Sequence, residues 1–113
     1  MEVAYQSSRL ENAIDIGVGS ANLASAVDGN DNQTLAWTTP QQGASRLFST
    51  TRTPGVSFDK PSAVSPAGQD VRLYALDVDE SGRAALAWIA DGAVWYSERP
   101  AHAGTWSVAT RVA

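Results

Sequence analysis

The sequence predicts an all-β protein made of small four-stranded antiparallel sheets that stack face to face. A motif occurs twice, as VDGNDNQTLAW at Val27–Trp37 and as VDESGRAALAW at Val78–Trp88. Turn-forming residues recur so often that the segments between them are about five to eight residues long, which suits strands better than helices. The Leu-Ala-Trp segments are apolar on both faces, as in strands that are covered by a layer on each side.

The repeat divides a single domain, residues 1–113, into a half unit and two complete units. The half unit covers residues 1–21, and the complete units cover 22–70 and 71–113. One pattern, an aromatic residue followed at alternate positions by Ser or Thr and then Arg, marks all three units, at Tyr5–Arg9, Phe48–Arg52 and Trp95–Arg99. The chain therefore contains about two and a half units, and the first unit lacks its first half.

Each complete unit has turn residues between four segments, and we expect one strand in each segment. The first segment ends at Val-Asp, the second carries Leu-Ala-Trp, and the third carries the pattern that ends in arginine. The fourth follows a glycine and contains a large apolar residue and a β-branched one. In chain order the segments are 22–28, 33–39, 47–52 and 58–64, and then 73–79, 83–90, 94–99 and 106–112.

Segment 83–90, RAALAWIA, is the main challenge to this assignment, because alanine and leucine favour helix by intrinsic propensity. Its counterpart at 33–39, QTLAWTT, carries β-branched threonines at the same place in the repeat. We therefore expect both segments to be strands.

The units resemble β-propeller blades, particularly the sialidase-like repeats of bacterial extracellular proteins, over nearly the whole chain. The matching features are Val-Asp before the first hairpin, Leu-Ala-Trp on the second strand, and a glycine followed by an aromatic residue at Pro54–Phe58 and Ala103–Trp106. The resemblance implies up-and-down four-stranded blades around a central channel, and it favours an extracellular or periplasmic location. The family's Asp-box turn is degenerate, because Thr53 and His102 stand where its aspartate would be.

About two and a half blades cannot close a propeller, which needs roughly four to eight. The resemblance therefore implies partners, either further blades from a longer parent chain or copies of this chain. A blade without a neighbour is expected to expose a Trp-rich face. A single β-sandwich or trefoil-like domain is the alternative fold for a chain of this length.

Composition excludes several classes of function. The net charge is −4, and Lys60 is the single lysine, so no basic footprint for nucleic acid exists. The chain has no cysteine and hence no disulfide or thiolate site. No apolar stretch approaches the roughly 18 residues of a membrane span, so we expect neither a nucleic-acid nor a membrane partner.

Catalytic and metal sites are not expected either. His102 is the only histidine, which argues against a two-histidine metal site and a Ser-His-Asp triad. Asp77–Gly82 reads D-x-D-x-S-G, which can open a calcium loop, but Ala85 and Trp88 occupy the places where a further acidic ligand would follow. A hairpin turn is the expected structure, and no cofactor is implied.

Aromatic residues supply the candidate binding site. Trp37 and Trp88 alternate with small residues and are expected in the core, whereas Trp95, Tyr96 and Trp106 flank a loop. Sugar recognition uses such aromatic faces with polar rims, although core or edge packing would explain them as well. The arginines of the repeated pattern, Arg9, Arg52 and Arg99, are expected to make structural hydrogen bonds or salt bridges rather than to form an anion site.

The leading hypothesis is a noncatalytic binding or scaffold module made of β-propeller blades, with carbohydrate or protein as its ligand. One alternative is a fragment of a glycosidase-like, sialidase-type enzyme in which Asp28, Asp77 and Asp79 face the channel. Another is an oligomerising propeller fragment with no ligand of its own.

Overall fold

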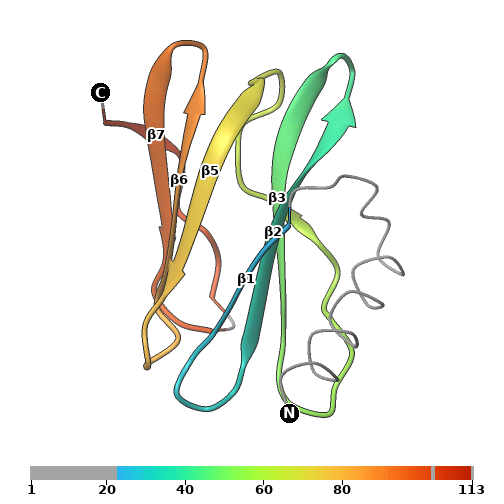
Figure 1. Ribbon diagram of the computed structural model, residues 1–113, viewed down its shortest axis with the longest axis vertical. Helices are drawn as coiled ribbons and strands as arrows, with labels where there is room; N and C mark the ends of the chain where they lie inside the picture. The colour runs from blue at the N-terminus through green and yellow to red at the C-terminus, as the bar shows by residue number, and fades with distance from the viewer. Residues whose placement is uncertain (1–22, 103, 113) are drawn as a thin grey trace.

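The computed structural model describes residues 23–102 and 104–112, and this part of the protein is all-β. Its eight strands form two four-stranded antiparallel sheets, and none of the described segments is helical (Figure 1). The predicted all-β class and four-stranded antiparallel sheets are confirmed, while neither sheet closes on itself. The predicted half unit, residues 1–21 with the Tyr5–Arg9 pattern, lies outside the described residues.

Both sheets are simple meanders in which each strand pairs with the next along the chain. The first sheet contains β1 (Leu23–Val27), β2 (Gln33–Gln41), β3 (Ala44–Arg52) and β4 (Ser62–Ala63). The second contains β5 (Val71–Val78), β6 (Ala84–Ala90), β7 (Ala93–Arg99) and β8 (Thr110–Arg111). The first sheet thus lies within the predicted unit 22–70, and the second within 71–113.

The two sheets share one register at the positions that the sequence repeat makes equivalent. Trp37 of β2 lies opposite Phe48 of β3, and Trp88 of β6 lies opposite Trp95 of β7. Strand β6 pairs with β5 on one side and with β7 on the other, so the predicted strand at 83–90 is confirmed. Sheet hydrogen bonds and the burial of Trp88 outweigh the helix propensity of its alanines.

Tight turns join the second and third strands of each sheet. The turns β2–β3 and β6–β7 place Gln42 and Gly43, and Asp91 and Gly92, at positive φ, as two-residue type I′ hairpins require. In the β5–β6 turn the Asp79 carboxylate accepts hydrogen bonds from the backbone N–H groups of residues 81 and 83. The D-x-D-x-S-G segment is therefore a hairpin turn, as expected.

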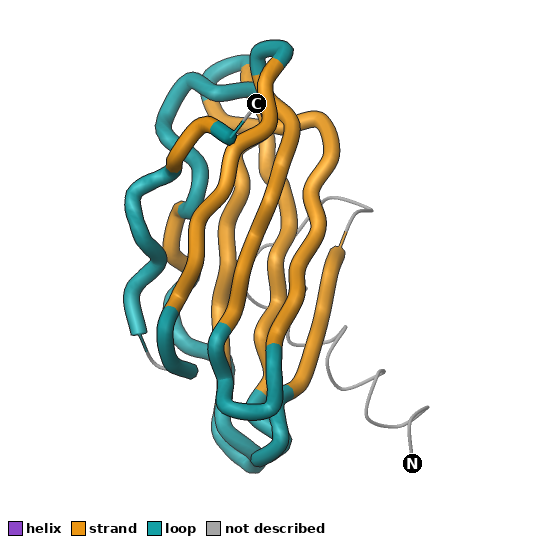
Figure 2. Tube along the Cα trace, turned by 90° about the vertical axis from the view of Figure 1, so that its left-hand side faces the viewer, coloured by secondary structure: helices purple, strands orange, loops and turns teal. Residues whose placement is uncertain are grey.

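The two sheets pack face to face through Leu86 and Trp88 of β6. These side chains lie in one buried cluster with Ala36 and Leu47 of the first sheet, and all four are at most 1% exposed. The small Ala36 leaves room for the indole of Trp88, whose Nε1 donates to Gln69 Oε1 at 2.8 Å. The strands of both sheets run in nearly the same direction (Figure 2), as in aligned sheet packing.

Strand β2 is buried on both faces, as the sequence predicts. Ala36 faces the second sheet, whereas Leu35 and Trp37 point the other way. Leu35 and Trp37 form a second buried cluster, with Phe48 and Phe58 packed against it. Leu23 also packs against this cluster.

Among the described residues another sheet covers strand β6 on one face only, so the expectation that layers cover it on both sides is wrong for this strand. Ile89 is 39% exposed and Leu73, opposite it on β5, is 65% exposed. Within the described residues no third sheet lies beyond β6. The exposed face is also not Trp-rich, because Trp88 points inward to the first sheet.

We call this exposed surface the outer face. It consists of three rows of side chains on β5, β6 and β7 that point away from the first sheet. In register the rows are Leu73, Ile89 and Val94; Ala75, Ala87 and Tyr96; and Asp77, Ala85 and Glu98.

Candidate functional site

The three predicted binding residues do not form one surface. Trp95 and Tyr96 are neighbours on β7 and therefore point to opposite faces. Trp95 packs against the core between the sheets, and its Nε1 donates to the carbonyl of Ala90 at 3.2 Å. Tyr96 lies on the outer face. Trp106 packs against the same core as Trp95 and lines a cavity that neither of the other two reaches.

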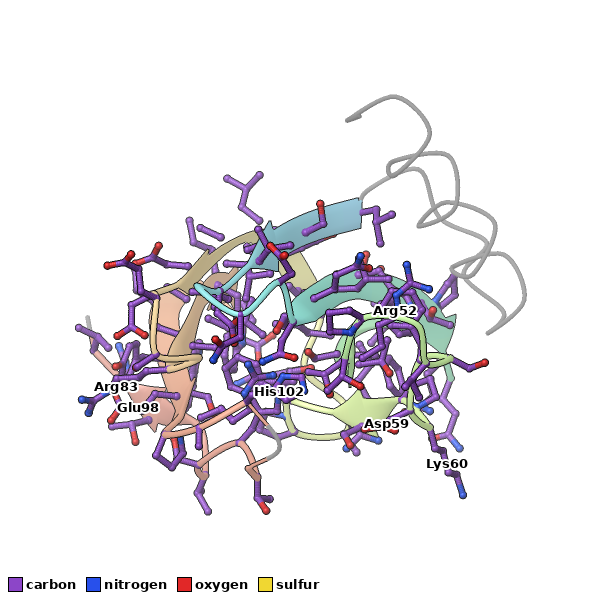
Figure 3. All side chains as sticks on the ribbon, turned by 90° about the horizontal axis from the view of Figure 1, so that it is seen from below. Arg52, Asp59, Lys60, Arg83, Glu98 and His102 are labelled. Carbon is purple, nitrogen blue, oxygen red and sulfur yellow. The ribbon has the colours of Figure 1, made fainter. Side chains whose placement is uncertain are left out.

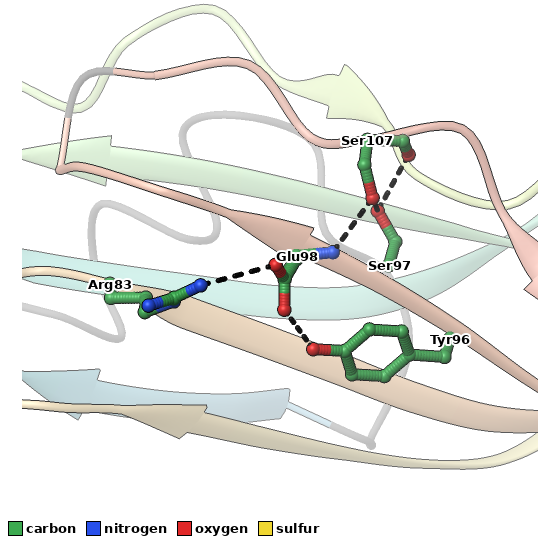
Figure 4. Close-up of polar contacts among 5 residues, drawn as sticks. All are labelled: Arg83, Tyr96, Ser97, Glu98 and Ser107. Carbon is green, nitrogen blue, oxygen red and sulfur yellow. Dashed lines mark hydrogen bonds and ion pairs between the residues drawn. The ribbon is translucent and has the colours of Figure 1, made fainter.

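Tyr96 belongs to a polar corner of the outer face, which Figure 4 shows. Its hydroxyl donates to Glu98 Oε2, and Arg83 Nη2 lies 3.4 Å from Glu98 Oε1. The hydrogen bond from Tyr96 lowers the pKa of Glu98, and the same bond raises the pKa of Tyr96. Both carboxylate oxygens of Glu98 are thus engaged within the protein.

A shallow cavity of about 110 Å³ adjoins this corner and is lined by Asp77, Asp79, Arg83, Ala84, Ala85, Tyr96 and Glu98. Asp79 is already held by its own turn, because Ser81 Oγ donates to Asp79 Oδ1 at 2.6 Å. Hydrogen bonds lower the pKa of Asp79, and the one from the Ser81 side chain has the largest effect. Asp77, Asp79 and Glu98 thus line one cavity together with Arg83, which carries the opposite charge.

Asp28, the third acidic residue considered, shapes a turn. It is buried, and its carboxylate accepts hydrogen bonds from the backbone N–H groups of Asn30 and Asn32 and from Asn32 Nδ2. Burial raises the pKa of Asp28, but these hydrogen bonds and the charge of His102 outweigh that effect and hold the pKa below its ordinary value. Asp28 thus stabilises the β1–β2 turn as a carboxylate.

Arg52 and Arg99, the two described arginines of the repeated pattern, make structural hydrogen bonds, as expected. In the first sheet Arg52 Nε donates to Gln33 Oε1 at 3.0 Å, and the guanidinium lies 4.8 Å from the ring centroid of Phe58. The second sheet has Ala84 where the first has Gln33. Arg99 consequently lacks the neighbouring amide that holds Arg52.

Arg99 instead joins the two sheets. Its Nη2 donates to Thr34 Oγ1 at 3.0 Å and to the carbonyl of Gly82 at 3.2 Å, and its guanidinium lies 5.4 Å from the ring centroid of Trp106. The side chain is only 1% exposed, and among the described residues Nε and Nη1 have no hydrogen-bond acceptor. Burial lowers the pKa of Arg99, and the charge of Asp28 opposes part of this shift.

A cavity of about 160 Å³ lies between the sheets beside Arg99. We call it the inter-sheet cavity, and it is lined by Ser49, Thr50, Thr51, Asp59, Lys60, Ser62, Arg99, Gly104 and Trp106. In the view from below, Asp59 and Lys60 lie beside the first sheet, on the opposite side of the molecule from Arg83 and Glu98 (Figure 3). The inter-sheet cavity and the polar corner of the outer face are therefore separate sites.

The hydroxyl-bearing wall of this cavity was not identified from the sequence. The chain is rich in serine and threonine, so the sequence does not distinguish Ser49, Thr51 and Ser62 from the other hydroxyl-bearing residues. The repeat gives one usable signal, because the third-strand pattern places Ser49 and Tyr96 at equivalent positions. Ser49 of the first sheet is small and leaves space beside Ala36, whereas Tyr96 of the second sheet fills the equivalent space beside Ala87.

Comparisons with known proteins add no assignment. The sequence matches no family model, no curated protein and no solved structure. In the described part of the chain no group of acidic residues and histidine could hold a metal ion. The same residues include no helix with the length and apolar character needed to cross a membrane.

Proposed function

We propose that this chain is a noncatalytic binding and scaffold module, made of β-propeller blades, whose outer face binds another four-stranded sheet. The supporting observation is the equivalence of Ala36 and Ala87. Ala36 lies in the middle of the face on which Trp88 packs. Ala87 occupies the same register position in the second sheet, and its face is open.

The outer face has the shape and chemistry of a docking surface for a tryptophan-bearing strand. In its middle row Ala75 and Ala87 leave the same space as Ala24 and Ala36 of the first sheet. Tyr96 takes the place of Ser49 at the β7 end of this row. Leu73 and Ile89 border that space and are exposed. Burying apolar surface contributes about 25 cal/mol per Å², so covering these side chains favours association.

The partner that fits this face is a sheet whose second strand points a Leu-x-Trp pair at Ala87. In this chain one such pair, Leu86 and Trp88, is already packed on the first sheet, and the other, Leu35 and Trp37, is buried among Phe48 and its neighbours. A second copy therefore has no free Leu-x-Trp face. The partner is a further blade, and successive blades docked in this way build a propeller.

Fusion of a third unit tests the proposal. A second copy of residues 71–113, joined after Ala113, should fold onto the outer face and raise the unfolding midpoint of the original two sheets. Ala87→Glu in the original unit should abolish this gain, because it buries a carboxylate at the new interface. Val56→Glu is the matched control, since it adds the same charge at a side chain that is 54% exposed and outside the outer face.

Two results would count against the proposal. The appended unit could remain unfolded by amide exchange, or Ala87→Glu could leave the gain in stability unchanged. Light scattering on the original chain supplies an independent check, for which we expect a monomer of 11.9 kDa. A dimer that Ala87→Glu dissociates would show that a second copy, and not a further blade, occupies the outer face.

A further inference from the structure

The inter-sheet cavity has one wall of hydroxyl groups from the first sheet. Ser49 lies opposite Ala36, on the face that packs on the second sheet, and Thr51 points the same way because side chains alternate along β3. Ser62 lies opposite Ser49 on β4 and shares its face. Three hydroxyl-bearing side chains therefore point across the cavity to Arg99, Gly104 and Trp106.

The walls of the inter-sheet cavity carry hydrogen-bond acceptors as well as donors. Ser49 Oγ donates to the carbonyl of Leu35 at 2.8 Å, so its oxygen remains able to accept a hydrogen bond. Asp59 adds a carboxylate whose Oδ2 lies 3.5 Å from Thr51 Oγ1. On the other wall lies Arg99, whose Nε and Nη1 are buried and have no acceptor among the described residues.

This mixture of groups selects the class of ligand. An oxyanion only accepts hydrogen bonds. Lys60 and Arg99 would attract it, but Asp28 already offsets part of the Arg99 charge, and the oxyanion would also meet the carboxylate of Asp59. A cation would meet Arg99 and Lys60. A hydroxyl group both donates and accepts, so a neutral ligand with several hydroxyls satisfies both walls.

Size and shape narrow the class further. Pockets for drug-sized ligands enclose roughly 300–1,000 Å³, and the inter-sheet cavity has about 160 Å³. That volume suits a single small ring. The edge of Trp106 adds apolar surface against which the C–H groups of a sugar can pack.

We infer that the inter-sheet cavity binds one neutral sugar ring. Hydroxyls of the sugar accept hydrogen bonds from Arg99 and donate them to Asp59 and to the hydroxyl oxygens of the first-sheet wall, which are those of Ser49, Thr51 and Ser62. Trp106 contacts the carbon skeleton of the sugar. The site goes beyond the scaffold role, since no residue of the outer face lines it.

Indole N–H resonances provide the assay, because the protein has four tryptophans and only Trp106 lines the cavity. Glucose, galactose and mannose are added separately to the full chain, with glucuronate and inorganic phosphate as charged probes. We expect at least one neutral sugar to shift the Trp106 resonance saturably, with a dissociation constant of about 1–10 mM. The resonance of Trp37, which lies on the other face of β2, should not move.

Thr51→Val removes a cavity hydroxyl at constant shape and should weaken binding about fivefold to tenfold. Thr110→Val makes the same change on β8, away from the cavity, and should bind like the unmodified chain. If Thr51→Val does not fold, Ser62→Ala on the short strand β4 takes its place.

Three outcomes would overturn the inference. No neutral sugar shifts Trp106 at about 50 mM, well above the expected dissociation constant. Phosphate or glucuronate alone shifts it, which would make the cavity an oxyanion site. The hydroxyl variants bind with unchanged affinity, which would place the sugar elsewhere.

Discussion

Glutamate at the two equivalent alanines should have very different effects, because the same strand position is covered in one sheet and open in the other. Ala36 is 0% exposed and contacts the inter-sheet core. Ala87 is only partly buried and lies on the outer face. The two substitutions add the same atoms and the same charge at one register position of a repeat.

The expected magnitudes follow from burial. Ala36→Glu places an unpaired carboxylate in an apolar core, which destabilises by about 3–5 kcal/mol, out of about 5–15 kcal/mol for a whole domain. Ala87→Glu can turn its carboxylate to water and should change the free energy of unfolding by less than about 1 kcal/mol.

Urea unfolding followed by tryptophan fluorescence measures the difference. With a urea m-value of about 1–3 kcal/mol/M, the midpoint for Ala36→Glu should fall by more than about 1 M, and that for Ala87→Glu by much less. Equal losses at both positions would refute the assignment of Ala87 to an open face. A tolerated Ala36→Glu would refute the packing of Trp88 on the first sheet.

Three further predictions concern individual contacts. Trp88→Ala should destabilise the chain by about 3–5 kcal/mol in the same urea assay, because the indole is buried between the sheets, and a loss below about 1 kcal/mol would contradict that burial. Gln33→Ala should cost about 1–2 kcal/mol by removing the buried acceptor of Arg52 Nε. Gln41→Ala removes an exposed acceptor, that of Arg46 Nη1, and should cost less than about 0.5 kcal/mol. The pKa of Asp28 is lower in the folded protein than in the unfolded chain, so its contribution to stability is present above about pH 4 and is lost as pH falls through the folded pKa. Asp28→Asn should therefore flatten the loss of stability as the pH falls below about 4, and an unchanged pH profile would argue against the hydrogen bonds at Asp28.

The strands could be predicted because each carries a local signal. Leu35, Ala36 and Trp37 are apolar on both faces, and the structure buries both. Segment 83–90 was identified as a strand by its repeat partner against its own helix propensity. The resemblance to propeller blades predicts four strands per unit, and both described sheets have four.

The sequence could not predict which face of a strand is covered by a neighbouring sheet, because this depends on the other layers of the protein rather than on the strand itself. Ala87 and Ala36 carry the same local signal and differ only in what lies opposite them. Trp95 and Tyr96 could be assigned to opposite faces, but which of the two faces is covered is again a tertiary property.

The inter-sheet cavity illustrates the same limit. Its walls come from Ser49 and Ser62 on one side and from Arg99 and Trp106 on the other, and the sheets bring these distant segments together. The unusual position of Arg99 could have been inferred, since the repeat replaces Gln33 with Ala84 and removes the acceptor that Arg52 uses.

The two ends of the strands differ in how much change they can accept. At the upper hairpin tips of Figure 1, no atom lies within 4 Å of the place where Gly43 or Gly92 would carry a Cβ, so the space around these turns is open even though their positive φ favours glycine. At the opposite end, one added to Gly29 would lie 2.9 Å from the carbonyl oxygen of Glu80. Peptides inserted at the upper tips would therefore project into open space, whereas an insertion at Gly29 would have to break its backbone hydrogen bond to Glu80, which joins the two sheets.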